Sequence, residues 1–595
     1  MTPFSPTLAQ VELKSARAID AIATRPWVVA AVLIALALVS YLPGLLALPA
    51  VDRAEIIYAE SSRAMLERGE LLDARFLEER YAFRPIGIYW LQMASGKFFG
   101  PDAWNAISTY RLPSLLGGLL AVLAVWWLLR PVLGPRGSLI AAGLYAVTPI
   151  VALQAQLAIP EGPLLLAAAL AQLTLLRIYC ASEGERHQVL VLLFWAAQGF
   201  GILLNALAVP ILSLSTIIGL FIFDRNLDWL KRLRPLIGIL LLVIIAAPWL
   251  LVRAHVDGGA PFGSLTWGEF LRALGGGQDM KWKAAPLTFT LAFLLGFLPG
   301  AVLLVPAIKG LWVGRVAALQ RFLFAWLVGY LAYLELIASK PALYTVQAMF
   351  PAAAAAAALA LERDGHLELP PGMLRLPGWF VLAGMAALYS GVLWIAGTPP
   401  SVCIVIGALM VTALFALAAI SARQEFAAAW LFSSVVGFAL FLGFTFGALL
   451  PHLKKGWPAE RIAEAIAPLQ RCVSGPVGVL GFREPSTIFV LGRESLAKPQ
   501  TIARWIAEGE GGIAVVEDRW HAALQTAVRN RGAELPLRSG CVEAINVMRG
   551  CPLSFSIYVT GQEKLDASCA VAAANVCKMP ITAVRQGGSA KSRCH

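Results

Sequence analysis

Charged side chains are scarce in this sequence. Only 14% of its 595 residues are Asp, Glu, Lys or Arg, whereas 58% are hydrophobic, and the mean hydropathy is +0.71. A water-soluble globule of this length would lack the polar surface needed to cover its core. The composition therefore excludes a soluble protein and predicts a chain that lies largely in a lipid bilayer, with membrane lipids as its surroundings.

The excess of basic residues does not indicate a nucleic-acid partner. The formal charge is +12 and the pI is near 9.4, but the Lys and Arg residues fall mainly in short loops between apolar runs. That distribution is typical of membrane proteins and differs from the clustered basic groove of a nucleic-acid binder. We therefore expect no nucleic acid among the partners.

Apolar runs alternate with these short loops along most of the chain. A helix of roughly 20 residues crosses the ~30 Å hydrocarbon layer of a bilayer, and about 13 runs approach that length. They lie at 27–49, 112–130, 137–156, 162–179, 187–204, 207–223, 235–252, 286–308, 322–338, 341–360, 377–397, 401–421 and 427–450. The sequence therefore predicts a polytopic α-helical membrane protein.

The loops divide into a basic and a nonbasic set. If the N-terminal segment with Lys14, Arg17 and Arg25 is cytoplasmic, every second loop should be basic. The basic loops carry Arg130, Arg136, Arg177, Arg186, Arg225, Lys231, Arg232, Arg234, Lys309, Arg315, Arg321, Arg363, Arg375 and Arg423. The short loops of the other set carry one cation, Lys340. This asymmetry predicts a cytoplasmic N-terminus, an odd number of spans and a tail on the periplasmic side.

The expected domains follow from this topology. They are a cytoplasmic segment at 1–26, a transmembrane domain at 27–450 with periplasmic loops 50–111 and 253–285, a periplasmic α/β domain at 451–580, and a disordered tail at 581–595. The first span is too long for a signal peptide, so we expect it to stay as an anchor. In the α/β domain, the pattern predicts a helix at 499–509 and strands at 475–482, 486–493 and 511–518.

Cysteine is sparse outside the tail, which holds six of the eight. These six are Cys472, Cys541, Cys551, Cys569, Cys577 and Cys594. An even number in a domain assigned to an oxidising compartment indicates disulfides, whose pairing spacing alone cannot give. Zinc is the alternative, but no CxxC pair is present, so disulfides are the favoured prediction.

The loop at 50–111 is too long for a simple connector. In its first part, EIIYAESSRAMLERGELL, apolar residues recur at helical spacing and Gly69 is placed to end the helix. This predicts an amphipathic helix on the membrane surface. The second part, RPIGIYWLQMASGKFFG, starts at Arg84 and carries Tyr89 and Trp90, which suit a membrane interface.

Three stretches resemble the GT-C class of membrane glycosyltransferases, in the branch of bacterial aminoarabinose transferases and protein O-mannosyltransferase relatives. They are DRAEIIYAESSRAMLERGELLDARF, RPIGIYWLQ and YRLPSLLGGLLAV. The resemblance implies the GT-C fold and inverting transfer of a sugar from a polyprenyl-phosphate donor. The acceptor would be a lipid similar to lipid A or lipopolysaccharide, an envelope glycan or a protein, at the periplasmic face of the bacterial inner membrane.

The same resemblance implies the acids of the site. Ala54 stands where the family has its first-loop Asp, which leaves Asp52 and Glu55 as alternatives for the group that positions or deprotonates the acceptor. Glu161, at the outer end of a predicted span, occupies the position of a family Asp. An acid beside an apolar helix is costly unless it is paired or faces a cavity, so Glu161 is the third candidate for a catalytic role.

The resemblance also implies the groups that bind the donor. Arg84 and Lys340 match cations that neutralise the departing phosphate, and Tyr344 follows Lys340 closely. The expected substrate-loop residues are Tyr58, Tyr89, Gln278 and Asp279. No metal ligand or other cofactor is predicted with certainty, although a divalent metal ion could assist.

Two alternatives stay open at this stage. Besides Ala54, the chain departs from the family at Ile57, Asn205 and Leu343, and these departures suit a catalytically lapsed homologue that binds polyprenyl-phosphate sugars. A transporter is the other alternative. It would need acids within its spans, and Glu335 is the main candidate for one.

Overall fold

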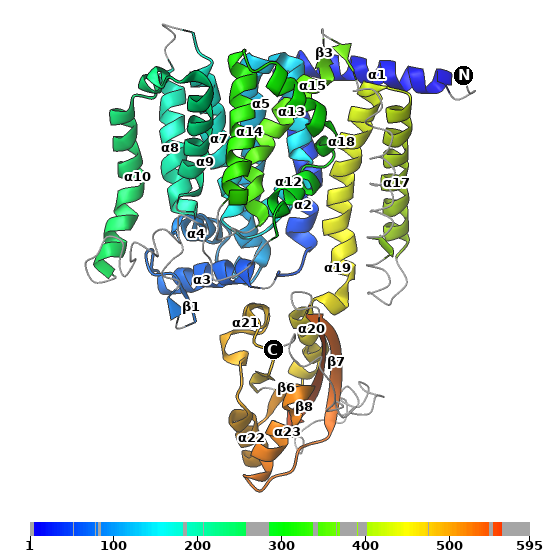
Figure 1. Ribbon diagram of the computed structural model, residues 1–595. Coiled ribbons are helices and arrows are strands. Elements are labelled where there is room, and N and C mark those ends of the chain that lie inside the picture. The colour runs from blue at the N-terminus through cyan, green and yellow to red at the C-terminus, as the bar shows by residue number, and fades with distance from the viewer. Residues whose placement is uncertain are drawn as a thin grey trace.

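The computed structural model describes residues 5–51, 53–77, 79–80, 85–182, 187–205, 207–256, 285–336, 343–363, 366–368, 389–390, 401–473, 475–546 and 551–561. Most of the described chain up to residue 452 forms a bundle of upright helices (Figure 1). The helices are α1 Ser5–Ala23, α2 Pro26–Ala47, α3 Ala54–Arg68, α4 Gly87–Phe99, α5 Ile107–Ala146, α6 Pro149–Gln156, α7 Glu161–Tyr179, α8 Gln188–Asn205, α9 Ala208–Asp224, α10 Pro235–Val256, α12 Thr288–Gly296, α13 Leu304–Val313, α14 Ala318–Leu336, α15 Phe350–Leu361, α17 Val402–Arg423, α18 Ala427–Phe444 and α19 Leu450–His452.

The two ends of the bundle carry different elements. Helix α1 lies across one end, and α3 lies across the opposite end next to the hairpin of β1, Arg75–Phe76, and β2, Glu79–Arg80 (Figure 1). The C-terminal residues 458–560 form a separate α/β unit beyond α3 (Figure 1). The described part of the chain therefore starts at one end of the bundle and ends beyond the other (Figure 1).

Apolar helices long enough to cross a membrane are present, but they are fewer than the sequence predicts. Among the described residues, six helices meet that length and composition, or seven if a bent pair counts as one span. The shorter apolar helices are Ala208–Asp224, Pro235–Trp249 and Thr345–Leu361. The predicted span at 377–397 lies almost entirely outside the described residues. The chain is thus a multi-pass membrane protein.

One predicted span differs from the structure in shape. The run at 286–308 is not one straight helix, because α12 and the segment Gly300–Val313 meet at an angle of 114°. The runs at 112–130 and 137–156 fall on the two sides of a kink in α5 at Gly134 (φ 73°), and the second run continues over α6. Hydropathy measures length and apolar character, so it does not detect the bend after α12.

Small residues let the central helices approach closely. Ala352 to Ala358 of α15 are all buried, and this helix packs against α5 and α13. Beside them, Phe293, Phe297 and Phe350 form a nearly parallel stack at the bend after α12, with ring centroids 5.8–6.3 Å apart. Close packing of small and aromatic side chains is what holds helices together in lipid, where apolar burial alone gives no preference.

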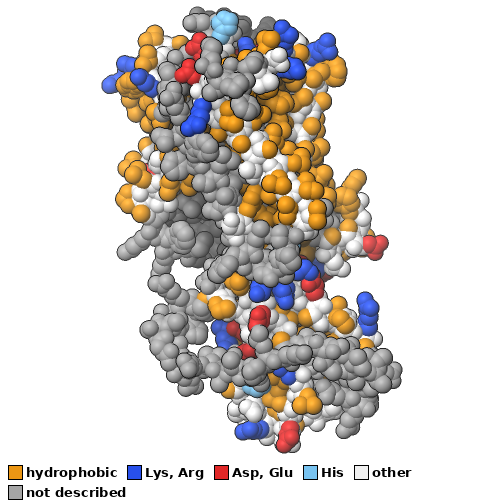
Figure 2. All heavy atoms as spheres, turned by 90° about the vertical axis from the view of Figure 1, so that its right-hand side faces the viewer, with side chains coloured by type: hydrophobic (Ala, Val, Ile, Leu, Met, Phe, Trp, Pro, Cys, Tyr) orange, Lys and Arg blue, Asp and Glu red, His pale blue; other side chains and the backbone are white. Residues whose placement is uncertain are grey.

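The outer faces of the bundle are apolar. On α10, Leu236, Ile237, Leu240 and Ile244 are all more than half exposed. Figure 2 shows hydrophobic side chains over the bundle, with charged side chains gathered at its ends and on the C-terminal unit. An apolar belt of this extent needs a lipid environment.

Helices α5 and α7 cross in van der Waals contact at a glycine. A Cβ atom on Gly162 would lie 2.4 Å from the Cβ of Ser114. We expect Gly162→Ala to overpack this crossing and to lower the free energy of unfolding by about 1–3 kcal/mol. Thermal unfolding of the purified protein measures the effect.

The control is Gly143→Ala in α5, the helix that α7 crosses, because a Cβ there would meet its nearest neighbour at 4.0 Å. Alanine has the better helix propensity, so we expect the control to be neutral or slightly stabilising. Equal destabilisation by both substitutions would contradict the steric explanation.

The C-terminal unit is a four-stranded sheet covered by helices. The strands are β5 Val477–Leu480, β6 Gly512–Glu517, β7 Arg538–Asn546 and β8 Cys551–Thr560, in the order β5-β6-β8-β7. Only β5 and β6 are parallel. The helices are α20 Pro458–Gln470, α21 Pro485–Leu491, α22 Pro499–Glu508 and α23 His521–Arg529.

Most of the sequence-based expectations for this unit are confirmed. The strands within 475–482 and 511–518 and the helix within 499–509 are present. The predicted strand at 486–493 is wrong, because these residues form α21 and the 3-10 turn Arg493–Ser495. Cys472, Cys541 and Cys551 are disulfide-bonded, as predicted, while the other three tail cysteines lie outside the described residues.

The first helix is tied to the last long helix of the bundle. The Glu12 carboxylate of α1 accepts hydrogen bonds from the backbone N–H groups of Ala428 (3.1 Å) and Ala429 (2.7 Å). These are the first residues of α18, so a carboxylate satisfies the free N–H groups at the positive end of that helix.

Candidate functional site

The first loop helix, α3, is present where the sequence predicts it. Glu55 lies in its first turn and Arg68 in its last, both favourable for the helix dipole. Gly69 ends the helix in the left-handed conformation with a φ of 68°. The sequence predicts an amphipathic helix on the membrane surface, and in the structure eleven of the fifteen residues of α3 are buried within the protein.

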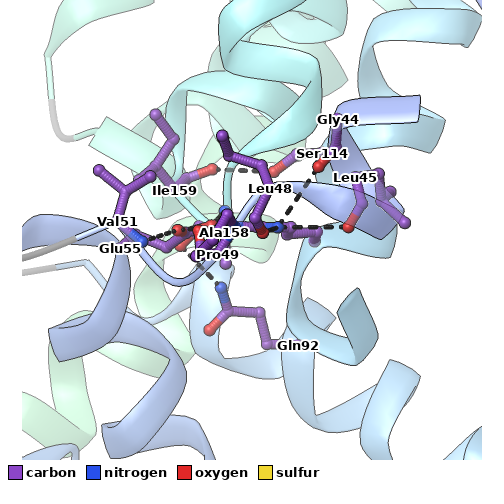
Figure 3. Close-up of polar contacts among 11 residues, drawn as sticks. Gly44, Leu45, Leu48, Pro49, Val51, Glu55, Gln92, Ser114, Ala158 and Ile159 are labelled. Carbon is purple, nitrogen blue, oxygen red and sulfur yellow. Dashed lines mark hydrogen bonds and ion pairs between the residues drawn. The ribbon is translucent and has the colours of Figure 1, made fainter. Parts of the chain in front are cut away.

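A buried ion pair joins α3 to the start of α5. The Arg111 guanidinium donates to both carboxylate oxygens of Glu55, from Nε at 2.7 Å and from Nη2 at 2.9 Å (Figure 3). The Arg111 side chain is fully buried and that of Glu55 is 1% exposed. This two-pronged geometry is the strongest form of an arginine–carboxylate contact.

Arg111 also binds the end of the first membrane helix. Its Nη1 donates to the carbonyl oxygens of Leu48 (2.6 Å) and Leu45 (3.2 Å), and its Nη2 donates to that of Pro49 (2.9 Å). These carbonyls lie at the C-terminal end of α2, where a cation is favoured by the helix dipole. One guanidinium therefore fixes the chain where it leaves α2 and where it enters α3.

Glu55 receives two further hydrogen bonds from the backbone. The N–H of Val51 donates to Oε2 (2.9 Å) and the N–H of Ala158 donates to Oε1 (2.8 Å). Each carboxylate oxygen thus accepts one bond from Arg111 and one from the main chain. The loop ahead of α7 is thereby joined to the first loop, and Figure 3 shows Ala158 and Val51 converging on Glu55.

Polar side chains extend this network towards α4 and α7. The Gln92 amide donates to the carbonyl of Ala158 (3.0 Å) and accepts from the Ser62 hydroxyl (2.7 Å). Ser114 donates to the carbonyl of Ile159 (3.2 Å). Glu161 follows as the first residue of α7 and is 4% exposed. The ends of α2, α3, α5 and α7 are thus bonded together on one face of the bundle.

The structure brings together some of the predicted site residues. Glu55 accepts from the backbone N–H of Ala158, three residues before Glu161, and the rings of Tyr58 and Tyr89 lie 5.6 Å apart in the same buried cluster. Several others lie outside the described residues: Asp52, Arg84, Gln278, Asp279 and Lys340. Tyr344 belongs to the 3-10 segment Leu343–Met349, and its side chain is likewise outside the described part.

Arg111 is the functional residue that reasoning from the sequence alone left without a role. It lies in the family-like stretch YRLPSLLGGLLAV, where it is the one charged residue. A cation at the edge of an apolar span calls for a partner. That rule could have singled out Arg111, but it could not have shown Glu55 as the partner 56 residues away.

A shallow hollow with room for about one water molecule lies between the loop after α2 and the C-terminal unit. It is lined by Ala50, Trp457, Pro458, Ala459, Glu460, Ser486 and Val490. Burial raises the pKa of the Glu460 carboxyl, and the nearby Glu464 raises it further, while the positive charge of Arg111 acts in the opposite direction. An acid that loses its charge readily therefore borders the hollow.

We expect Glu460→Gln to stabilise the protein at neutral pH. Because the folded state raises the pKa of this carboxyl, its ionisation opposes folding once the pH exceeds the ordinary glutamate range. The gain in melting temperature should be present at pH 7–8 and vanish near pH 4, where the carboxyl is protonated in both states. The exposed Glu543 of β7 does not contribute to the shift of Glu460, so Glu543→Gln is the control. A gain for Glu460→Gln that is independent of pH would contradict this explanation.

The described residues do not form a metal site, since no cluster of three His, Cys, Asp or Glu side chains is found among them. The charged groups on this face instead form ion pairs with one another. The chemistry that this part of the chain can supply is therefore carboxylate and guanidinium chemistry at a membrane boundary.

Comparison with known proteins agrees with this fold. The family described as dolichyl-phosphate-mannose-protein mannosyltransferase matches residues 83–252, which include Arg111, Ala158 and Glu161. The solved structure of ArnT from Cupriavidus metallidurans bound to undecaprenyl phosphate superposes with a TM-score of 0.65 and 16% identity, covering 88% of this chain and 97% of that one. The chain therefore has the GT-C fold of membrane glycosyltransferases.

The most informative sequence relatives narrow that class. The undecaprenyl phosphate-alpha-4-amino-4-deoxy-L-arabinose arabinosyl transferase 1 of Pseudomonas fluorescens is 30% identical over 377 residues, or 59% of this chain. The corresponding transferase of Edwardsiella ictaluri is 29% identical over 379 residues, or 61% of this chain. The chain spans 65% and 64% of these two relatives. The resemblance to aminoarabinose transferases predicted from the sequence is confirmed.

Proposed function

We propose that this protein is a glycosyltransferase that moves a sugar from a polyprenyl-phosphate donor to an acceptor at the periplasmic face of the bacterial inner membrane. The observation that carries the proposal is the similarity to undecaprenyl-phosphate aminoarabinose transferases over 377 residues. The shared fold with ArnT supports it. A lipid similar to lipid A is the favoured acceptor, with an envelope glycan or a protein as the other candidates.

The proposed topology rests on where the basic loops meet. At the end of the bundle covered by α1, the Arg136 guanidinium lies 3.3 Å from the Asp20 carboxylate and 3.7 Å from that of Glu362. Loops from the predicted cytoplasmic set thus gather on one end, whereas α3 and the α/β unit lie at the other (Figure 1). We infer a cytoplasmic N-terminus, an odd number of spans (about 13 by hydropathy) and a periplasmic α/β domain at 451–580.

The proposed catalytic acid is Asp52. Both oxygens of Glu55 already accept hydrogen bonds from Arg111 and the main chain, which leaves Glu55 poorly placed to take a proton from an acceptor. Glu55 instead fixes the loop on which Asp52 lies. Glu161 is proposed to line the site from the start of α7.

The proposed reaction is a single inverting displacement. The acceptor oxygen attacks the anomeric carbon of the sugar, its proton passes to Asp52, and the bond from that carbon to the phosphate oxygen breaks. Arg84, Lys340 and Tyr344 would bind the polyprenyl phosphate that departs with the electron pair. Gln278 and Asp279 would contact the sugar, whereas the burial of Tyr58 and Tyr89 favours a packing role.

The alternative interpretation as a transporter depended on Glu335 as its main acid within a span, and the structure gives Glu335 another role. The carboxylate of Glu335 accepts from the N–H of Thr290 (2.9 Å) and the N–H of Leu287 (3.2 Å), so it caps the start of α12. A carboxylate bound at a helix N-terminus has a structural role that requires no transported ion. The alternative that the chain is a catalytically lapsed homologue still rests on Ala54. The transfer experiment distinguishes it from an active transferase.

The test is transfer by the purified full-length chain in lipid nanodiscs. A panel of radiolabelled polyprenyl-phosphate sugars is supplied with envelope extract, and labelled acceptor is separated from donor. One donor should give product with release of polyprenyl phosphate. If no donor gives product but the chain binds undecaprenyl phosphate and Ala54→Asp gains turnover, the protein is a lapsed transferase and the proposal fails.

A further inference from the structure

Helix α3 presents a charged stripe away from the bundle. Arg53, Glu60 and Glu67 follow one another at intervals of seven residues. A helix turns by about 100° per residue, so Glu60 and Glu67, seven residues apart, share one face of α3, and Arg53 lies immediately before the helix. Glu55 is displaced from Glu60 by five residues, or about 140°, and points away from that face.

The C-terminal unit meets this stripe with charges of opposite sign. Glu484 lies 3.2 Å from the Nε of Arg53, immediately before α3. Two turns further on, the Nε of Arg493 lies 2.5 Å from Glu60, and its Nη1 lies 2.8 Å from Glu67. The stripe thus runs from a positive to a negative charge along α3, whereas its partners run from the negative Glu484 to the positive Arg493.

The central pair of this contact is well shielded. The Glu60 carboxylate is 1% exposed and lies between Arg493 and Arg63 of its own helix, whose Nη2 is 2.7 Å away. Burial lowers the pKa of the Arg493 guanidinium, but the hydrogen bond and charge of Glu60, together with the charge of Glu67, raise it above its ordinary value. Removal of Arg493 would therefore leave the buried Glu60 carboxylate with one of these two cationic partners, Arg63.

An aromatic ring reinforces the ion pairs. Phe489 of α21 is buried in the same apolar cluster as Ile56, Met65 and other residues of α3 and α4. The guanidinium carbon of Arg63 lies 5.3 Å from the centre of the Phe489 ring, and the Tyr110 ring meets it edge-on at 6.2 Å. On its own side, Glu484 accepts from the amide of Asn546 (3.2 Å). The contact between α3 and the C-terminal unit thus involves buried residues on both sides.

We propose that the C-terminal α/β unit is a positioning element of the membrane-face site, in which Glu484 and Arg493 hold α3 so that Glu55 stays seated on Arg111. The inference rests on the proposed glycosyl transfer for its catalytic consequence. Helix α3 lies between two sets of ion pairs, one to the bundle and one to the α/β unit. Loss of the ion pairs to the α/β unit frees α3 to move relative to the bundle.

Hydrogen exchange and kinetics of the full chain in nanodiscs test this role. In Arg493→Ala and Glu484→Ala, the amides of residues 54–68 should exchange at least about tenfold faster than in the native chain, while those of β6 stay protected. The kcat of transfer should fall about tenfold with the donor KM within about twofold, because α3 is mispositioned rather than the donor site removed.

Two further variants keep the test specific. Arg504→Ala is the matched control, because Arg504 is half exposed and pairs only at 3.9 Å with Glu508 and Glu510 of its own unit. The exchanged pair Arg53→Glu with Glu484→Arg should recover protection that Glu484→Arg alone loses. This pair remains informative if Arg493→Ala does not fold.

Each outcome decides the matter. Unchanged exchange in α3, or an equal change in Arg504→Ala, overturns the positioning role, as does faster exchange with an unaltered kcat in an active enzyme. If the native chain transfers no sugar, the proposed function fails. In that case accelerated exchange of α3 together with unchanged binding of undecaprenyl phosphate still supports the positioning role, and protected α3 overturns it.

Discussion

Replacement of Asp52 by Asn is expected to lower sugar transfer by roughly 10²- to 10⁴-fold, the range that loss of a general base produces. The substitution keeps the size of the side chain and removes its ability to take a proton. Because Glu55 rather than Asp52 fixes the loop, the melting temperature should not change. Initial rates with the labelled donor, together with thermal unfolding, measure both quantities on one preparation.

The controls for Asp52 lie in the same loop. Asp73→Asn removes a carboxylate that pairs with the Nε of Arg75 at 2.7 Å, and it should leave the rate within about threefold. Glu55→Gln should lower both rate and melting temperature, because it disrupts the pair with Arg111. If Asp52→Asn retains full turnover and Glu55→Gln loses activity without loss of stability, the assignment of the two acids is reversed.

Arg111→Leu is expected to lower the free energy of unfolding by about 3–5 kcal/mol, because the buried Glu55 carboxylate loses its charge partner. The carbonyl oxygens of Leu45, Leu48 and Pro49 lose their donors as well. Lysine offers one ammonium in place of the planar fork, so Arg111→Lys should recover only part of the loss. Chemical or thermal unfolding in a fixed detergent gives the comparison.

A double substitution separates charge from packing at this position. Arg111→Leu combined with Glu55→Leu removes both charges, so the pair should be less destabilising than the sum of the single substitutions. Additive losses would show that the ion pair has no energetic coupling. They would also leave the carbonyl contacts at the end of α2 as the main contribution of Arg111.

The sequence correctly predicted helices and strands whose signals lie within their own residues. Helix α3 was predicted from its spacing and from Gly69, which can adopt the positive φ that a helix end requires. Strands β5 and β6 are short apolar runs bounded by turns, and they were predicted for that reason. The same rule misled at α21, because Thr487, Ile488 and Val490 resemble a strand whereas Pro485 starts a helix.

The contacts of the site could not be predicted in the same way. Arg111 binds carbonyl oxygens more than 60 residues earlier in the chain, and those acceptors have no side-chain signature. The charges of the α3 stripe are seven residues apart in the sequence, but of its partners Glu484 lies between two predicted strands and Arg493 ends the segment 486–493 that was wrongly predicted as a strand. Hydropathy likewise reported the apolar character of 286–308 without its bend of 114°.

The capping of α18 by Glu12 has a consequence for biosynthesis. The acceptor and its donors are 416 residues apart, which at ribosomal rates corresponds to roughly 20–80 s between their emergence. During that interval α1 has no α18 to cap, and its carboxylate remains hydrated at the membrane surface. The first helix to be made is therefore among the last to be docked, and the bundle closes only when the ribosome has passed residue 429.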